Sequence, residues 1–141
     1  MKSVDNVQPF EWRIRVYYED TDAQGVVYYA NYFRYMERAR TEWLRALGVD
    51  QSRLLNEERR MFVVTATNAE FVAPAKYNDE VVVTARLTSL KRATFAIEQN
   101  IYSDDPDRTL FVRGGIKAAF LNADTLRPVR VPAEFFEGPQ T

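Results

Sequence analysis

The sequence EDTDAQGVVYYANYFRYMERARTEWL, residues 19–44, decides the fold. Its first part carries two acids, Asp20 and Asp22, and turns at Gly25. Its second part has apolar residues three or four positions apart, the spacing that places side chains on one face of a helix. These residues are Tyr32, Met36, Ala39, Trp43 and Leu47. Gly48 follows, as expected just past a helix C-terminus, so the stretch predicts an acidic turn and then one long helix.

A carboxylate in this turn would lie close to the N-terminus of the predicted helix. That end of a helix carries unpaired backbone N–H groups and a partial positive charge. A developing oxyanion could be held there beside a nucleophile or a base. Asp22 is the candidate carboxylate, and the alternative is that it caps the helix or the turn, a common use of aspartate. We interpret Asp20 as a structural acid of the turn.

The composition limits the chemistry that is open to this chain. Its 141 residues are expected to form one domain, residues 1–141, and the 46% hydrophobic content is enough for a substantial core. There is no cysteine and no histidine, which excludes disulfides, thiolate catalysis, Ser-His-Asp triads and the usual zinc ligands. We therefore expect no metal and no cofactor. A net charge of −1 argues against general binding to nucleic acid.

The remainder of the chain has the pattern of successive strands. Strands are predicted over 13–18, 62–72, 80–90, 94–103 and 109–121, and a short second helix over 49–60. In the first strand, Ile14, Val16 and Tyr18 are expected to face the core. Gly114 and Gly115, inside the last strand, indicate a bulge or a close approach of two backbones. This order predicts an α+β fold, with an antiparallel sheet of about five strands packed on one helix.

The surfaces that such a fold leaves open bear on assembly and location. One face of the sheet would cover the helix, but the other face and the edge strands need water, charge or another subunit, so a homo-oligomer is expected. The polar lead-in, residues 1–9, lacks the apolar core of a signal peptide, and no apolar run is long enough to span a membrane. The sequence therefore predicts a cytoplasmic protein.

Two stretches carry a resemblance to a known family. Residues 17–32, YYEDTDAQGVVYYANY, and residues 71–79, FVAPAKYND, resemble the motifs of the 4-hydroxybenzoyl-CoA thioesterase family. Within that family the chain is most similar to the bacterial acyl-CoA thioesterases associated with the Tol–Pal system, over residues 13–135. The resemblance implies the hotdog fold, in which a curved antiparallel sheet wraps a central helix. It also implies dimers, often paired into tetramers, with active sites between subunits.

The resemblance assigns roles to individual residues. Asp22 matches the family's catalytic carboxylate, which attacks a thioester carbonyl or activates water. Many Tol–Pal-type members have histidine where this chain has Tyr29, and the role implied for the position is a backbone N–H that points at the thioester oxygen. The tyrosine side chain adds no acid–base help, because a phenol is a poor base at neutral pH. Its ring could instead pack at the turn. Gly25, at the turn of the motif, is implied to lie against the substrate.

Three charged residues are further candidates for binding substrate. Glu37 lies two helical turns after Tyr29, and an acid at this position faces the acyl pocket in some members. The alternative for Glu37 is a salt bridge to Arg34, Arg38 or Arg40 on a solvated face. Lys91 and Arg92, at the tip between two strands, match a region where family members meet the phosphates of coenzyme A. Charge on an exposed tip is also a common means of keeping a protein soluble.

The function predicted from the resemblance is hydrolysis of an acyl-CoA to a carboxylic acid and free coenzyme A. A non-catalytic hotdog protein that binds acyl-CoA or acyl carrier protein is the alternative, and acyl carrier protein is a possible partner. The two hypotheses diverge at Asp22, because binding alone needs no carboxylate beside the thioester carbon. A hotdog hydratase would use histidine with an acid, so the absence of histidine counts against it.

Overall fold

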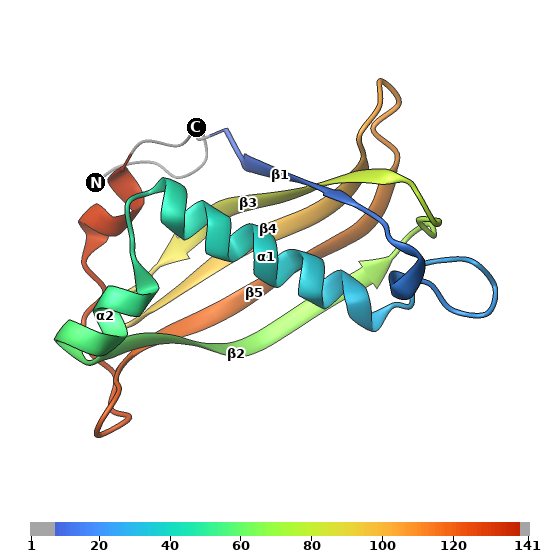
Figure 1. Cartoon of the computed structure of the whole chain (residues 1–141). Coiled ribbons are helices and arrows are strands. Elements are labelled where there is room, and N and C mark those ends of the chain that lie inside the picture. The colour runs from blue at the N-terminus through green and yellow to red at the C-terminus, as the bar shows by residue number, and fades with distance from the viewer. Residues whose placement is uncertain (1–7, 139–141) are drawn as a thin grey trace.

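The computed structural model describes residues 8–138, which fold as one curved sheet around one long helix (Figure 1). This arrangement confirms the predicted hotdog fold. The helices are α1 (Ala30–Ala46) and α2 (Gln51–Glu58). The strands are β1 (Phe10–Arg15), β2 (Arg60–Phe71), β3 (Glu80–Leu90), β4 (Thr94–Ser103) and β5 (Leu110–Asn122). Residues 1–7 of the predicted polar lead-in lie outside the described part of the chain.

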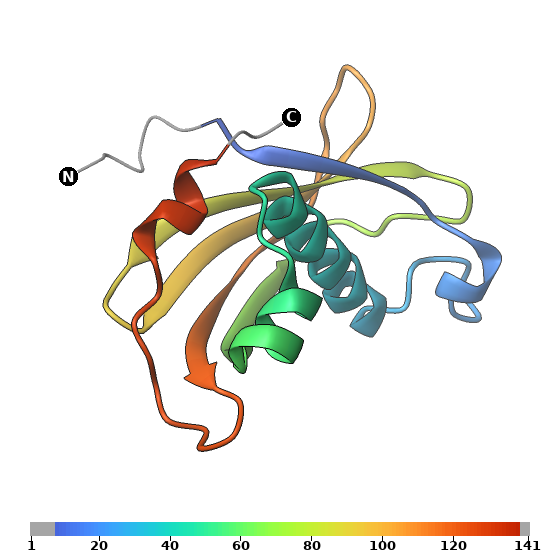
Figure 2. The same cartoon turned by 60° about the vertical axis from the view of Figure 1, so that its left-hand side comes forward.

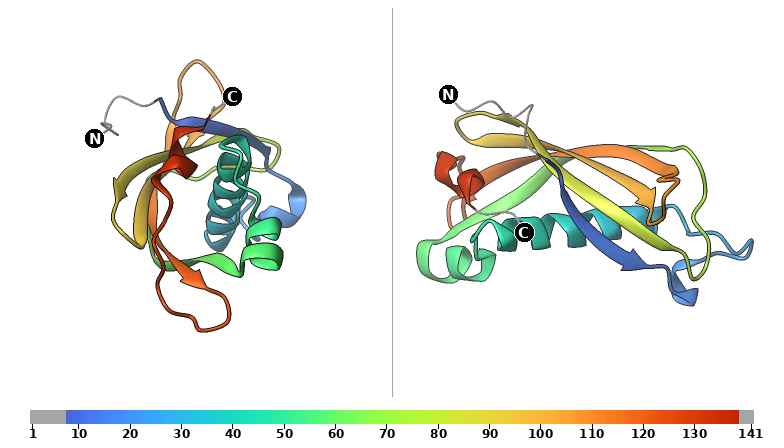
Figure 3. Two further views of the ribbon diagram at one scale, coloured as in Figure 1. Left: turned by 90° about the vertical axis from the view of Figure 1, so that its left-hand side faces the viewer. Right: turned by 90° about the horizontal axis from the view of Figure 1, so that it is seen from above.

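All neighbouring strands of the sheet are antiparallel, in the order β1-β3-β4-β5-β2. The first and second strands of the sequence are therefore the two edges. In β1, Phe10 lies opposite Ala85 of β3, and in β2, Phe71 lies opposite Val112 of β5. The sheet curves so that α1 lies on its concave side, as the views along and across the helix show (Figures 2 and 3).

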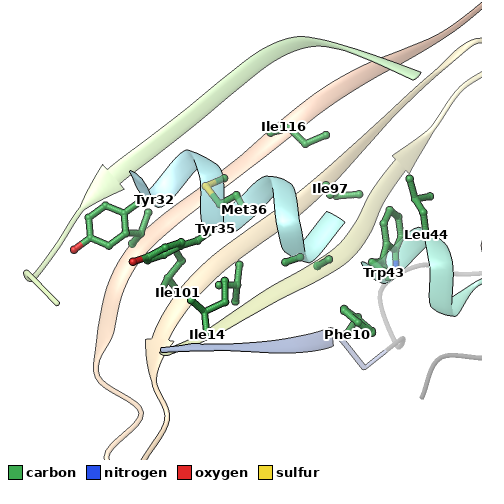
Figure 4. Close-up of a cluster of buried hydrophobic side chains, with 14 of the residues drawn as sticks. Phe10, Ile14, Tyr32, Tyr35, Met36, Trp43, Leu44, Ile97, Ile101 and Ile116 are labelled. Carbon is green, nitrogen blue, oxygen red and sulfur yellow. The ribbon is translucent and has the colours of Figure 1, made fainter. Parts of the chain in front are cut away.

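The core lies between α1 and the concave face of the sheet. The buried face of α1 carries the residues Tyr32, Tyr35, Met36, Ala39, Trp43 and Leu44. These side chains pack against Ile97, Ile101 and Ile116 from β4 and β5, and against Ile14 from β1 (Figure 4). The apolar residues at helical spacing thus form the face of α1 that packs on the concave side of the sheet.

Of the two alternatives predicted at Gly114 and Gly115, the structure has the close approach of backbones and not the bulge. Gly114 and Gly115 pair in register with β2 and β4, and the irregularity in β2 falls between Val64 and Ala66. A Cβ atom built on Gly114 would lie 2.7 Å from the carbonyl oxygen of Asn68 and 3.2 Å from Cε of Met36. Glycine at this position therefore lets α1 lie close against the sheet.

The first strand is displaced from its predicted bounds. It starts at Phe10 and ends at Arg15, and a short 3₁₀ turn over Tyr18–Asp20 follows. Ile14 and Val16 are buried as expected, but the inward orientation expected for Tyr18 is wrong, because its side chain is 79% exposed. The turn forms because the Asp20 carboxylate accepts a hydrogen bond from the Tyr17 N–H, which ends the extended conformation early.

Ion pairs connect outward-facing side chains of the sheet with one another and with the turn between β4 and β5. Ion pairs join Arg13 to Asp104 (3.1 Å), Arg108 to Glu11 (2.8 Å) and Arg86 to Glu98 (3.5 Å). At the edge formed by β2, in contrast, all residues from position 64 to 71 except Ala69 are exposed. Within residues 8–138, β1 and β2 each lack a strand partner on one side, and β2 is the one with this long exposed stretch.

Two further observations concern the ends of the fold. A second short 3₁₀ turn, Ala133–Glu137, lies near the C-terminal end of the described residues, and Phe136 stacks on Trp43 with ring centroids 5.5 Å apart. Among residues 8–138, no helix is long and apolar enough to cross a membrane.

Candidate active site

The acidic turn of the motif is a closed loop that leads into α1. The Tyr28 N–H donates to the Asp20 carbonyl oxygen (2.9 Å), which joins the two ends of the loop. Inside it, the Asp22 N–H donates to the Val26 carbonyl and the Gly25 N–H donates to the Asp22 carbonyl. Gly25 has a φ of +81°, a conformation that costs a residue with a side chain free energy. Glycine therefore shapes the loop that presents Asp22.

The Asp22 side chain is partly exposed, and one of its two carboxylate oxygens accepts a hydrogen bond within the loop. Its Oδ1 accepts a hydrogen bond from the Gln24 N–H (2.9 Å), so it caps its own turn, and the residue at the N-cap of α1 is Tyr29. Within residues 8–138, no protein group bonds to Oδ2 of Asp22. One carboxylate oxygen is thus oriented by the loop while the other can reach water or a substrate.

The N-terminus of α1 presents unused donors. The N–H groups of Asn31 and Tyr32 donate to the carbonyls of Tyr28 and Tyr29. In the described part of the chain, the N–H groups of Tyr29 and Ala30 have no backbone acceptor. A helix start with such donors favours an oxyanion nearby.

Aromatic rings surround this helix start. The ring of Tyr29 is exposed and meets the edge of Phe71 at a centroid distance of 5.7 Å, and Phe71 stacks on Tyr32 at 5.8 Å. The Tyr32 hydroxyl accepts a hydrogen bond from the Ala75 N–H, and burial raises the pKa of this phenol. The Val27 N–H donates to the Ala75 carbonyl (2.8 Å). These contacts bring the two motifs of the sequence together at one end of α1.

Glu37 lies on an exposed part of α1, and the predicted alternative of a salt bridge is not found. Among the described residues, no basic nitrogen lies within 4.0 Å of its carboxylate. Arg40 instead donates to Oε1 of Gln99 (3.1 Å), and burial lowers the pKa of this guanidinium while the charge of Glu37 opposes that shift. Glu37 is therefore free to meet a ligand or a second chain.

Lys91 and Arg92 lie in the exposed turn between β3 and β4, at the end of the sheet opposite the Asp22 loop (Figure 3). The 11 residues of β3 separate the two ends, a distance of about 35 Å at the usual rise of a strand. One chain therefore does not bring these cations to Asp22. A site that contains all of the predicted residues needs a second subunit.

The sequence patterns did not indicate a role for Tyr35, whose hydroxyl donates to the Asp20 carboxylate (2.8 Å). Tyr35 lies on the buried face of α1, where a tyrosine hydroxyl usually needs a partner. That requirement indicates from the sequence that Tyr35 has a polar partner, but it does not identify Asp20 as that partner.

Two cavities lie away from Asp22. One, of about 230 Å³, lies between α2 and the start of β2 and is lined by Leu54, Leu55 and Phe62 among others. The other, of about 380 Å³, lies beside the turn between β4 and β5 and includes Lys76 and Asp79. Within residues 8–138, no group of three or more acidic side chains is arranged to hold a metal ion.

The hotdog fold and the sequence matches over most of the chain together define this protein as a thioesterase. The chain belongs to the thioesterase-like superfamily, whose sequence model matches residues 16–138. It is 38% identical over 125 residues to the acyl-CoA thioesterase YbgC of Haemophilus influenzae, covering 89% of this chain and 90% of the relative. It is 36% identical over 131 residues to YbgC of Helicobacter pylori, covering 89% and 96%.

Solved structures agree with this assignment. A probable thioesterase from Bartonella henselae is 31% identical, with a TM-score of 0.81 over 89% of this chain and 100% of that one. The 4-hydroxybenzoyl-CoA thioesterase from Pseudomonas sp. strain CBS-3 has a TM-score of 0.82 over 93% and 99% of the two chains. At 23% identity it establishes the shared fold alone. The predictions of the family, the hotdog fold and the thioesterase class are thus confirmed.

Proposed function

We propose that this protein hydrolyses an acyl-CoA thioester to a carboxylic acid and free coenzyme A, with Asp22 as the catalytic carboxylate. The single observation that carries the proposal is the free Oδ2 of Asp22 in a loop that closes onto the start of α1. The family, and relatives named as acyl-CoA thioesterases, support the reaction type. No metal or other cofactor enters the proposed reaction.

In the proposed reaction, the start of α1 stabilises the oxyanion, and the Asp22 carboxylate acts as the nucleophile or the base. The thioester oxygen accepts hydrogen bonds from the N–H groups of Tyr29 and Ala30, which stabilise the negative charge that develops there. Asp22 then either attacks the carbonyl carbon, which expels the thiolate of coenzyme A and leaves an anhydride for water to cleave, or takes a proton from a water that attacks. Because Tyr29 contributes a backbone group, the absence of histidine at this position removes nothing that the reaction needs.

The proposal includes a homo-oligomer that is a dimer or a tetramer. The exposed edge of β2 can pair with the same edge of a second copy, and antiparallel pairing would continue the sheet. It would also place the partner's turn between β3 and β4 at the same end of the assembly as Asp22. Lys91 and Arg92 could then meet the phosphates of coenzyme A, while Gly25 and Glu37 line the acyl part. A monomer in light scattering that is fully active would contradict this assembly.

The test is Asp22→Asn, assayed with a panel of short-chain, long-chain and aromatic CoA thioesters. Asparagine keeps the size and can still accept from the Gln24 N–H, but it removes the charge. Turnover is expected to fall by about a hundredfold to ten-thousandfold, since a base or nucleophile supplies about that much. Substrate affinity and the thermal midpoint should change little.

The matched control is Asp107→Asn, at an exposed acid in the turn between β4 and β5. It should keep the turnover of the unmodified protein. Unchanged turnover in a folded Asp22→Asn protein would remove the proposed mechanism and favour the alternative, a protein that binds acyl-CoA or acyl carrier protein without catalysis.

A further inference from the structure

Asp20 joins three segments around the Asp22 loop. Its Oδ2 accepts hydrogen bonds from the Tyr35 hydroxyl (2.8 Å) and from the Tyr17 N–H (2.9 Å). Its carbonyl oxygen accepts from the Tyr28 N–H (2.9 Å) and from Nδ2 of Asn31 (2.9 Å). One residue thus holds the chain before the loop, the chain after the loop and the first turns of α1.

The anchor of this cluster is the buried side chain of Tyr35. Tyr35 is fully buried, and its ring meets the ring of Tyr32 edge to face at 6.2 Å. Both hydroxyls point toward the N-terminal end of α1 (Figure 4). Burial raises the pKa of Tyr35, and the hydrogen bond to Asp20 raises it further, so the phenol keeps its proton and remains a donor.

We infer that Asp20 is a positioning residue, which fixes the Asp22 carboxylate relative to the N–H of Tyr29; this inference rests on the proposed function. Asp22 follows Asp20 by two residues, and Tyr29 follows directly after Tyr28, which is bonded to the Asp20 carbonyl. A shift of Asp20 therefore moves the carboxylate and the oxyanion donors relative to each other. A misplacement of about 1 Å is enough to reduce a rate by about a hundredfold.

The hydrogen-bond geometry distinguishes a structural role of the Asp20 side chain from a role of its negative charge. Both side-chain hydrogen bonds of Asp20 go to the same oxygen, Oδ2. The amide oxygen of asparagine can accept both of them, whereas alanine can accept neither. If Asp20 acts by holding the loop, the neutral asparagine should therefore replace it and alanine should not.

The experiment compares Asp20→Ala, Asp20→Asn and Asp107→Ala in the full chain, with kcat, KM and the thermal midpoint measured for each. We expect Asp20→Ala to lower kcat by about tenfold to a hundredfold while KM changes less than about threefold, because only the reacting geometry is disturbed. Asp20→Asn should keep kcat within about threefold of that of the unmodified protein. Asp107→Ala should behave as the unmodified protein does.

Two results would overturn the inference. The first is a kcat for Asp20→Ala equal to that of Asp107→Ala, and the second is a loss for Asp20→Asn as large as that for Asp20→Ala. If Asp20→Ala does not fold, Tyr35→Phe removes one of the two donors and keeps the ring. It should lower kcat with KM unchanged, and a normal kcat would then refute the inference.

Asp22→Asn, measured together with these variants, distinguishes failure of the proposed function from failure of the positioning role of Asp20. Normal turnover of Asp22→Asn would refute the proposed function itself. An inactive Asp22→Asn together with a fully active Asp20→Ala would refute the positioning role alone.

Discussion

Gln99 is a fully buried polar side chain at the centre of the sheet, and its replacement by leucine tests how α1 is held there. Its Nε2 donates to the carbonyls of Met36 (2.9 Å) and Thr84 (3.3 Å), and its Oε1 accepts from Arg40 (3.1 Å). One side chain thus connects β4 to β3 and to the middle of α1. Gln99→Leu keeps most of the volume and removes all three hydrogen bonds.

The expected decrease in the free energy of unfolding follows from the polar groups that lose Gln99 as a hydrogen-bond partner. The Thr84 carbonyl loses a buried donor, which costs about 1–3 kcal/mol, and the charged, partly buried Arg40 loses its acceptor on Gln99, which costs about 1.5–3 kcal/mol. The Met36 carbonyl keeps its acceptor role inside α1, so it adds little. The leucine side chain recovers about 1 kcal/mol through its apolar surface. The net decrease in the free energy of unfolding is about 1.5–5 kcal/mol, which lowers the thermal midpoint by roughly 5–17 °C.

Urea unfolding and thermal unfolding of both proteins would measure this difference. Each is run at several protein concentrations, because the proposed oligomerisation would add to the apparent stability. Gln51→Leu, at an exposed position in α2, is the matched control and should change the free energy of unfolding by less than about 0.5 kcal/mol. A Gln99→Leu protein as stable as this control would refute the reasoning that the buried amide holds α1 on the sheet.

Two other substitutions give further tests. Gly114→Ala is expected to lower the free energy of unfolding by about 1–3 kcal/mol, since the added Cβ would lie 2.7 Å from the Asn68 carbonyl; urea unfolding measures the loss, and an unchanged midpoint would contradict it. The hydrogen bond from Arg59 holds the pKa of Asp124 below its usual range. The pair therefore adds stability above the unfolded-state pKa, near 4, which is lost as pH falls through the folded-state value. Asp124→Asn should lower the thermal midpoint slightly at pH 7 and not at about pH 2; an equal difference at both would contradict this.

The elements that the sequence predicts well are those that depend on a single periodic pattern. The face of α1 follows from apolar residues at helical spacing, and β3 and β4 follow from alternation. The end of β1 was wrong because Tyr17 and Tyr18 favour extended structure while the Asp20 carboxylate imposes a turn. Local propensity does not report on such a side-chain bond.

The candidate site was predictable only in part. The motif predicts Asp22 and Tyr29 as site residues, and the fold places them on one loop and at the helix start that follows it. The pairing of Asp20 with Tyr35 could not be read from spacing, because it depends on how the loop folds back on α1. Whether Lys91 and Arg92 meet Asp22 depends on a second chain, so the pattern within one sequence does not determine it.

The strand order determines when, during synthesis on the ribosome, the Asp22 loop can acquire its final surroundings. Both edge strands precede their partners in the chain, since β1 pairs with β3 and β2 pairs with β5. The hairpin of β3 and β4 has local contacts and can form as it emerges, while β2 must wait for β5. A nascent chain that ends before residue 110 already contains α1 and the loop but lacks the strand that joins β2 to the sheet. Release of the last strand, rather than translation of the motif, therefore sets the earliest moment at which one chain can complete the surroundings of this loop.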